Sequence, residues 1–122
     1  MVDVYMQRAI KVAAANHTPF GAVLVNEQKQ IIKAANQVSS TNDSVKHAEI
    51  VALQKMAQLK NYSRHNLSLY TTGEPCPMCA SAVVWAGVNY VYWGLSIKEL
   101  AHFGNQISIE SQRVYAASWR TI

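Results

Sequence analysis

A proline-flanked pair of cysteines organises this chain, in the run Glu74-Pro75-Cys76-Pro77-Met78-Cys79. Cysteines three positions apart put both sulfurs on one side of a helical turn, where they can share a metal ion. Among the four histidines, only His47 is followed two positions later by an acidic residue, Glu49. His47, Cys76 and Cys79 are therefore the candidate ligand set. Three protein ligands leave one tetrahedral position open, which is typical of a catalytic zinc site.

Two glutamates compete for the proton-transfer role beside such a site. In a helix, positions two apart point about 200° away from each other, so Glu49 is not expected to join His47 as a ligand. Near a helix start it can instead lean over the open face of the metal and carry protons from a zinc-activated water. The alternative is Glu74, for which we predict a stabilising interaction with the positive end of the helix that follows.

The order of these motifs resembles a known family. His-x-Glu followed by Pro-Cys-x-x-Cys is the general signature of zinc deaminases, whereas Cys-x-x-Cys alone is equally typical of a redox pair or a core pair. The chain resembles the cytidine deaminase superfamily, in the branch of bacterial guanine deaminases and tRNA adenosine deaminases. The resemblance covers roughly residues 5 to 95 and is carried by Pro19-Phe20-Gly21-Ala22-Val23, Asn36, His47-Ala48-Glu49 and Glu74-Pro75-Cys76-Pro77-Met78-Cys79.

The resemblance implies a set of roles. They are hydrolytic deamination with one Zn²⁺ per chain, Glu49 as the proton carrier, and substrate contacts from Asn36, Phe20, Trp85 and Ala48. From the residues alone, Asn36 is equally a turn cap, and Phe20 and Trp85 are equally core or interface residues. The resemblance further implies a homodimer, for which Tyr90, Tyr92 and Trp119 are candidate interface residues.

Composition limits the class of protein. The 122 residues predict one domain, residues 1–122, and half of them are apolar. No apolar run approaches the ~20 residues that span a bilayer, and the N-terminus lacks a signal-peptide pattern, so we expect a cytoplasmic location and no membrane partner. The two cysteines cannot form a disulfide framework. Basic residues are scattered despite a net charge of +4, so a nucleic-acid partner stays open but is not favoured.

Hydrophobic periodicity predicts an α/β fold, a three-layer α/β/α sandwich on a mixed five-stranded sheet. Helices are expected at 2–15, at 45–59 with Asp43 or Ser44 as the cap and His47 in the first turn, from 76 or 77 to 86, at 97–102 and at 110–119. Strands are expected at 20–25, 30–35, 67–72, 88–93 and 106–109, the first two as an antiparallel hairpin, with a loop at 36–44. Sites gather at the carboxyl ends of strands in such sheets, which brings His47 and Cys76 together.

The sequence leaves several candidate substrates. Pro19-Phe20-Gly21, Cys76-Pro77 and Trp85 resemble guanine deaminase, so a purine base or nucleoside is favoured, with guanine converted to xanthine and ammonia. The alternatives are a tRNA adenosine-to-inosine deaminase, a deaminase of cytosine or another aminated heterocycle, and a non-catalytic zinc-binding partner subunit. The intact Glu49 argues against the last of these.

Overall fold

The computed structural model describes residues 2–120 and 122. Its elements follow the chain in this order: α1 (Val2–Ala15), β1 (Gly21–Val25), β2 (Ile31–Ala35), α2 (Val38–Thr41), α3 (Ala48–Gln58), β3 (Ser68–Gly73), α4 (Pro77–Ala86), β4 (Tyr90–Leu95), α5 (Ile97–Leu100) and α6 (Ser111–Ala116). None of the described helices is long and apolar enough to cross a membrane. The cytoplasmic location stays a prediction.

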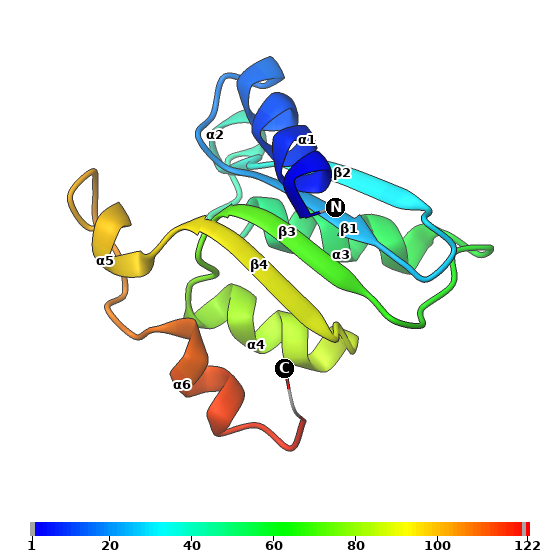
Figure 1. The fold of residues 1–122 in the computed structure, drawn as a ribbon. Coiled ribbons are helices and arrows are strands. Elements are labelled where there is room, and N and C mark those ends of the chain that lie inside the picture. The colour runs from blue at the N-terminus through cyan, green and yellow to red at the C-terminus, as the bar shows by residue number, and fades with distance from the viewer. Residues whose placement is uncertain (1, 121) are drawn as a thin grey trace.

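The strands form one mixed sheet in the order β2-β1-β3-β4. β1 pairs antiparallel with β2 and β3, and β3 pairs parallel with β4. Helix α1 covers one face of this sheet, and α3 and α4 cover the other (Figure 1). The predicted hairpin and the helix layers are confirmed.

Side chains of β1 alternate between two cores, because successive residues of a strand point to opposite faces. Val23 packs with Ala9 of α1 and Tyr70 of β3, whereas Leu24 packs with residues of α3 and α4. All five β1 residues are buried, as expected for a strand covered on both faces. Gly21 is required where α1 approaches the strand, because a Cβ there would clash with the Ala9 carbonyl.

The predicted fifth strand at 106–109 is wrong, because the sheet has four strands within the described residues. Ile107 and Ile109 alternate with polar residues as in a strand. Their side chains, however, are 60% and 43% exposed. None of the four described strands pairs with the segment. Alternation alone therefore predicted a strand that has no partner.

Several element boundaries also differ from the prediction. Helix α3 begins at Ala48 with His47 as its N-cap, so the predicted cap at Asp43 or Ser44 is wrong. Asp43 instead accepts a hydrogen bond from the Val45 amide in a local turn. The predicted loop at 36–44 contains the single helical turn α2, which ends at Asn42 in the left-handed conformation. β4 starts later than predicted and continues through Gly94, and α6 is shorter than predicted.

Candidate metal centre and active-site cleft

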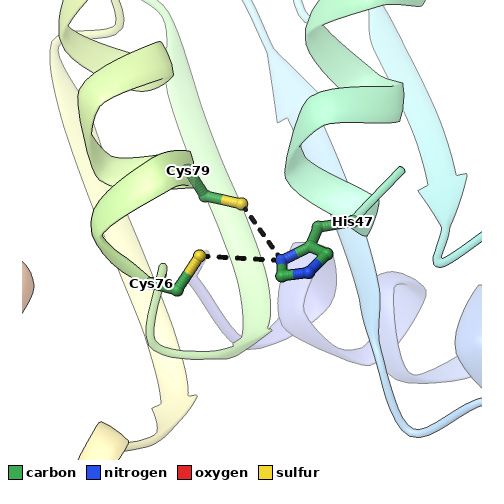
Figure 2. Close-up of side chains that lie close together, drawn as sticks. All are labelled: His47, Cys76 and Cys79. Atoms are coloured by element: carbon green, nitrogen blue, oxygen red, sulfur yellow. Dashed lines mark hydrogen bonds between the residues drawn. The ribbon is translucent and has the colours of Figure 1, made fainter. Parts of the chain in front are cut away.

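Two helix starts bring the three predicted ligands together. His47 is the N-cap of α3 and Cys76 is the N-cap of α4, both in extended backbone conformation and neither capping its helix with its side chain. Cys79 follows in the first turn of α4 and is fully buried. Figure 2 shows the His47 ring facing both sulfurs with its Nδ1 atom, which lies 3.6 Å from Cys76 Sγ and 3.5 Å from Cys79 Sγ.

These distances fit a shared zinc ion. Zn–S bonds of about 2.3 Å and Zn–N bonds of about 2.0–2.1 Å at a tetrahedral angle place nitrogen and sulfur about 3.6 Å apart. One Nδ1 atom has a single proton or lone pair, so it cannot make two good hydrogen bonds to the two sulfurs at once. The three donor atoms all lie within 4.8 Å of one another. The predicted ligand set His47, Cys76 and Cys79 can therefore hold one zinc ion.

The two thiols have different acidities in this arrangement. A hydrogen bond from Cys79 lowers the pKa of the Cys76 thiol to about 4, and His47 adds to the effect. The same bond, together with burial, raises the pKa of Cys79. The hydrogen bond to Cys76 raises the pKa of His47. Cys76 is thus the more acidic thiol of the pair, and because zinc binds thiolates, metal binding releases protons from this group.

Glu49 lies beside this group as the second residue of α3 and is only 7% exposed. Burial raises the pKa of its carboxyl group from 4.5 to about 7, because the charged form loses its hydration. A carboxyl group whose pKa is near neutrality can both accept and return a proton at working pH. Its position supports the predicted proton-transfer role.

A cleft of about 490 Å³ opens onto these residues. His47, Glu49 and Cys76 line one part of it. We call these residues the ligand wall. A second part is formed by three consecutive residues, Asn105, Gln106 and Ile107, which we call the loop wall. The cleft volume lies in the range of small-molecule sites.

Two of the predicted substrate contacts line the cleft. Asn36 does so while its Oδ1 accepts a hydrogen bond from the Val38 amide at 2.9 Å, so it is a turn cap as well. Phe20 lines the cleft and also packs against the main core. Both residues therefore have a structural contact and a place at the cleft, and their contact with substrate stays a prediction.

The other two predicted contacts are placed elsewhere. Ala48 is fully buried in the core and is not among the described cleft-lining residues. Trp85 is 77% exposed on α4, and its ring packs edge-on against Trp119 with centroids 4.9 Å apart. Among the residues that the structure describes, the cleft lining does not include Trp85. The structure therefore does not bring either residue to the cleft of its own chain.

Glu74 has a different role from the predicted one. Its carboxylate accepts hydrogen bonds from the backbone amides of Ile97 and Ser111 and from the Ser111 hydroxyl. The predicted interaction with the start of α4 is wrong, because Glu74 caps α5 and α6 instead. The loop wall was also missed, since Gln106 and Ile107 were assigned to the predicted strand 106–109 and Asn105 directly precedes it. Two adjacent amides after Gly104 were the available signal.

Comparison with known proteins identifies the family. The model of the cytidine and deoxycytidylate deaminase zinc-binding region matches residues 2–95. The chain belongs to this family. Deaminases of the family are zinc-dependent hydrolases that act on nucleobases or nucleosides.

Individual relatives fall into two groups. Guanine deaminase of Bacillus subtilis is 34% identical over 108 residues, which are 84% of this chain and 69% of the relative. The tRNA-specific adenosine deaminase of Buchnera aphidicola is 42% identical over 83 residues, 67% of this chain. The crystal structure of the Bacillus subtilis guanine deaminase superposes with a TM-score of 0.76 at 31% identity, covering 93% of this chain and 74% of the other.

The chain is shorter than most of these curated relatives. It spans 55% of the Buchnera enzyme. It spans only 9% of the chloroplastic tRNA(adenine(34)) deaminase of Arabidopsis thaliana, to which it is 36% identical over 112 residues. Similarity over the deaminase domain therefore identifies the chemistry of the family, and the substrate has to be argued from the cleft.

Proposed function

We propose that this chain catalyses the hydrolytic deamination of a purine base or nucleoside, with guanine as the favoured substrate. The observation that carries the proposal is the buried Glu49 carboxyl group, with a pKa of about 7, beside the His47, Cys76 and Cys79 group in one cleft. In this reaction one water is consumed, the exocyclic C–N bond is broken, and ammonia and an oxo base are formed.

Each residue of the cleft has a distinct task. His47, Cys76 and Cys79 would hold the zinc ion, which would supply the chemistry of a water with a lowered pKa. Glu49 accepts a proton on its carboxylate and returns it to the leaving amino nitrogen. Asn36 uses its Oδ1 for the Val38 amide, so its Nδ2 hydrogens serve the acceptor edge of the base. Phe20 offers a ring face to a flat heterocycle, a contact of about 1–3 kcal/mol.

Similarity to a guanine deaminase extends along most of the chain, as does similarity to a tRNA(adenine(34)) deaminase, so the motif residues carry the preference for guanine. The Bacillus subtilis guanine deaminase matches in sequence over 84% of this chain and in structure over 93% of it. The motif residues Pro19-Phe20-Gly21 and Cys76-Pro77 agree with this choice. Basic residues such as Arg113 and Arg120 are scattered along the sequence and do not form a run that would favour RNA.

A tRNA adenosine deaminase is the second candidate. The 42% identity to the Buchnera tRNA-specific adenosine deaminase supports it. Such an enzyme needs a basic surface, which a second copy of the chain could extend. We expect a homodimer, and its mass can be measured by light scattering.

One assay separates these candidates. Zinc-loaded protein is mixed with guanine, guanosine, adenine, adenosine, cytosine and cytidine, and ammonia release is measured. Guanine is expected to be the fastest substrate. Fast release from cytosine would move the substrate to the pyrimidines, and no release from any of the six would contradict the proposal for free bases and nucleosides. In that case, salt-sensitive binding of a tRNA anticodon stem-loop, measured by fluorescence anisotropy, would favour the tRNA candidate.

A further inference from the structure

Glu74 is a buried carboxylate that joins two distant points of the chain. It is 7% exposed. Its Oε1 accepts the Ile97 amide at 2.8 Å, and its Oε2 accepts the Ser111 amide at 2.7 Å and the Ser111 hydroxyl at 2.8 Å. Ile97 and Ser111 are the first residues of α5 and α6. One side chain therefore ties together both ends of the segment 98–110.

This segment carries the loop wall of the cleft. Within the described chain, the hydrogen bonds of residues 101–110 all go to partners in 97–113, so none anchors the segment to the sheet. Leu100 supplies the apolar anchor, because it is buried and lies against Gly73. Glu74 supplies the polar anchor. Besides these side-chain bonds, the Glu74 amide donates to the Leu95 carbonyl before α5, so the Glu74 carboxylate is the described polar link that reaches the far end of the segment at Ser111.

We propose that Glu74 is a positioning residue that holds segment 98–110 against the cleft and so sets where the Asn105 and Gln106 amides meet the substrate. Glu74 precedes Cys76 by two residues, so the same short stretch of chain positions both the loop wall and the predicted metal ligand. Amide side chains both donate and accept, which suits the edge of an aminated heterocycle. The claim that the Asn105 and Gln106 amides meet the substrate rests on the proposed function. The claim that Glu74 holds segment 98–110 in place does not depend on it.

The chemistry requires a carboxylate at this position. Three donors converge on two oxygens, and each bond to a charged acceptor is stronger than a neutral one. Glutamine has the same shape but one oxygen, so its NH₂ group would face a backbone N–H and leave that donor buried without an acceptor. Glu74→Gln is therefore the sharpest variant.

The matched control is Glu99→Gln. Glu99 also caps α5, through a capping box with Ser96, but it is exposed and does not reach Ser111. The substitution Glu99→Gln removes a charge at the start of α5, keeps a side-chain oxygen that can accept the Ser96 amide, and leaves the tie between the two ends intact. Ser111→Ala is a milder second variant, because it removes the hydroxyl donor and keeps the amide.

The experiment compares hydrogen exchange of peptides covering 98–110 with steady-state kinetics of the zinc-loaded proteins. For Glu74→Gln we expect exchange about ten- to a hundredfold faster, and for Ser111→Ala about fivefold faster. We expect KM for the best base to rise about tenfold in Glu74→Gln, with kcat changed less and zinc still bound stoichiometrically. Glu99→Gln is expected to keep the wild-type KM and the wild-type exchange of residues 104–110.

Two results would overturn the proposal. One is exchange of 98–110 that stays at the wild-type rate in both Glu74→Gln and Ser111→Ala. The other is a rise in Glu99→Gln that equals the rise in Glu74→Gln. If Glu74→Gln does not fold, the proposal is tested by comparing hydrogen exchange of residues 98–110 in Ser111→Ala with that in Glu99→Gln. If the wild-type protein deaminates no base, the exchange data still test the positioning, and only the proposed function fails.

Discussion

The two walls of the cleft are built in opposite ways. The ligand wall stands at the starts of α3 and α4, where Ala48, Glu49 and Cys79 are buried against the sheet. The loop wall lies in a segment whose residues 101–105 and 107–110 are exposed, and one carboxylate ties its two ends. The difference is that the residues to which we assign the reaction chemistry are held by the core of the fold, whereas the loop wall is not. We infer that the choice of substrate depends on the loop wall, which has fewer contacts with the rest of the fold.

The largest effect is expected from removing Cys79, the fully buried member of the predicted ligand set beside the ligand wall. Cys79→Ser replaces a buried thiol ligand with a hydroxyl that zinc does not prefer, so bound zinc should fall at least about tenfold and turnover should be lost. Zinc content by elemental analysis is the measurement. Met78→Leu in the same motif is the control and should keep one zinc per chain. A Cys79→Ser protein with full zinc would contradict the ligand assignment.

Next in size is Glu49→Gln, which keeps the volume of the side chain and removes its ability to carry a proton. Turnover is expected to fall by about 10²- to 10⁴-fold while zinc stays bound. The rate of ammonia release is measured beside zinc content. Substantial turnover in this variant would exclude Glu49 as the proton carrier and leave the role to another group.

The pH dependence of stability gives a third test of the ligand wall, on metal-free protein. Burial raises the pKa of Glu49 from 4.5 to about 7, so between these values the folded state binds more protons than the unfolded state. The contribution of Glu49 to the free energy of unfolding therefore falls as the pH rises through this range, by about 3 kcal/mol in total. Urea unfolding of wild type and Glu49→Gln at several pH values measures it. A difference between the two proteins that does not change with pH would contradict the raised pKa.

The same contrast explains what the sequence could predict. Cys76 and Cys79 follow from short-range spacing within one turn, and His47 follows from its own His-x-Glu motif, since metal ligands are limited to a few residue types. Asn105, Gln106 and the true role of Glu74 could not be predicted, because they depend on contacts between residues far apart in sequence. The alternation around Ile107 and Ile109 predicted a strand. A strand also needs a partner, and periodicity carries no information about partners.

A smaller effect is expected at Asn36, which lines the cleft, caps a turn and is predicted to contact the substrate. Asn36→Asp keeps an oxygen for the Val38 amide but loses the Nδ2 donor, whereas Asn36→Ala loses both. If the donor contacts substrate, both variants should raise KM about tenfold, and only Asn36→Ala should also lower stability, by about 1 kcal/mol. Steady-state kinetics and thermal unfolding separate the roles. Wild-type KM in Asn36→Asp would leave the turn cap as its only role.

The smallest effect is expected at Trp85, because the structure places it away from both walls. Its ring is exposed and packs on Trp119, so Trp85→Ala removes an aromatic contact of about 1 kcal/mol and leaves the cleft of its own chain unchanged. KM should stay within about threefold of wild type, and the fluorescence of Trp119 should report the lost neighbour. A tenfold rise in KM would mean that Trp85 reaches a cleft, and the geometry allows only that of another copy. Light scattering of wild type and variant would then show a dimer lost together with activity.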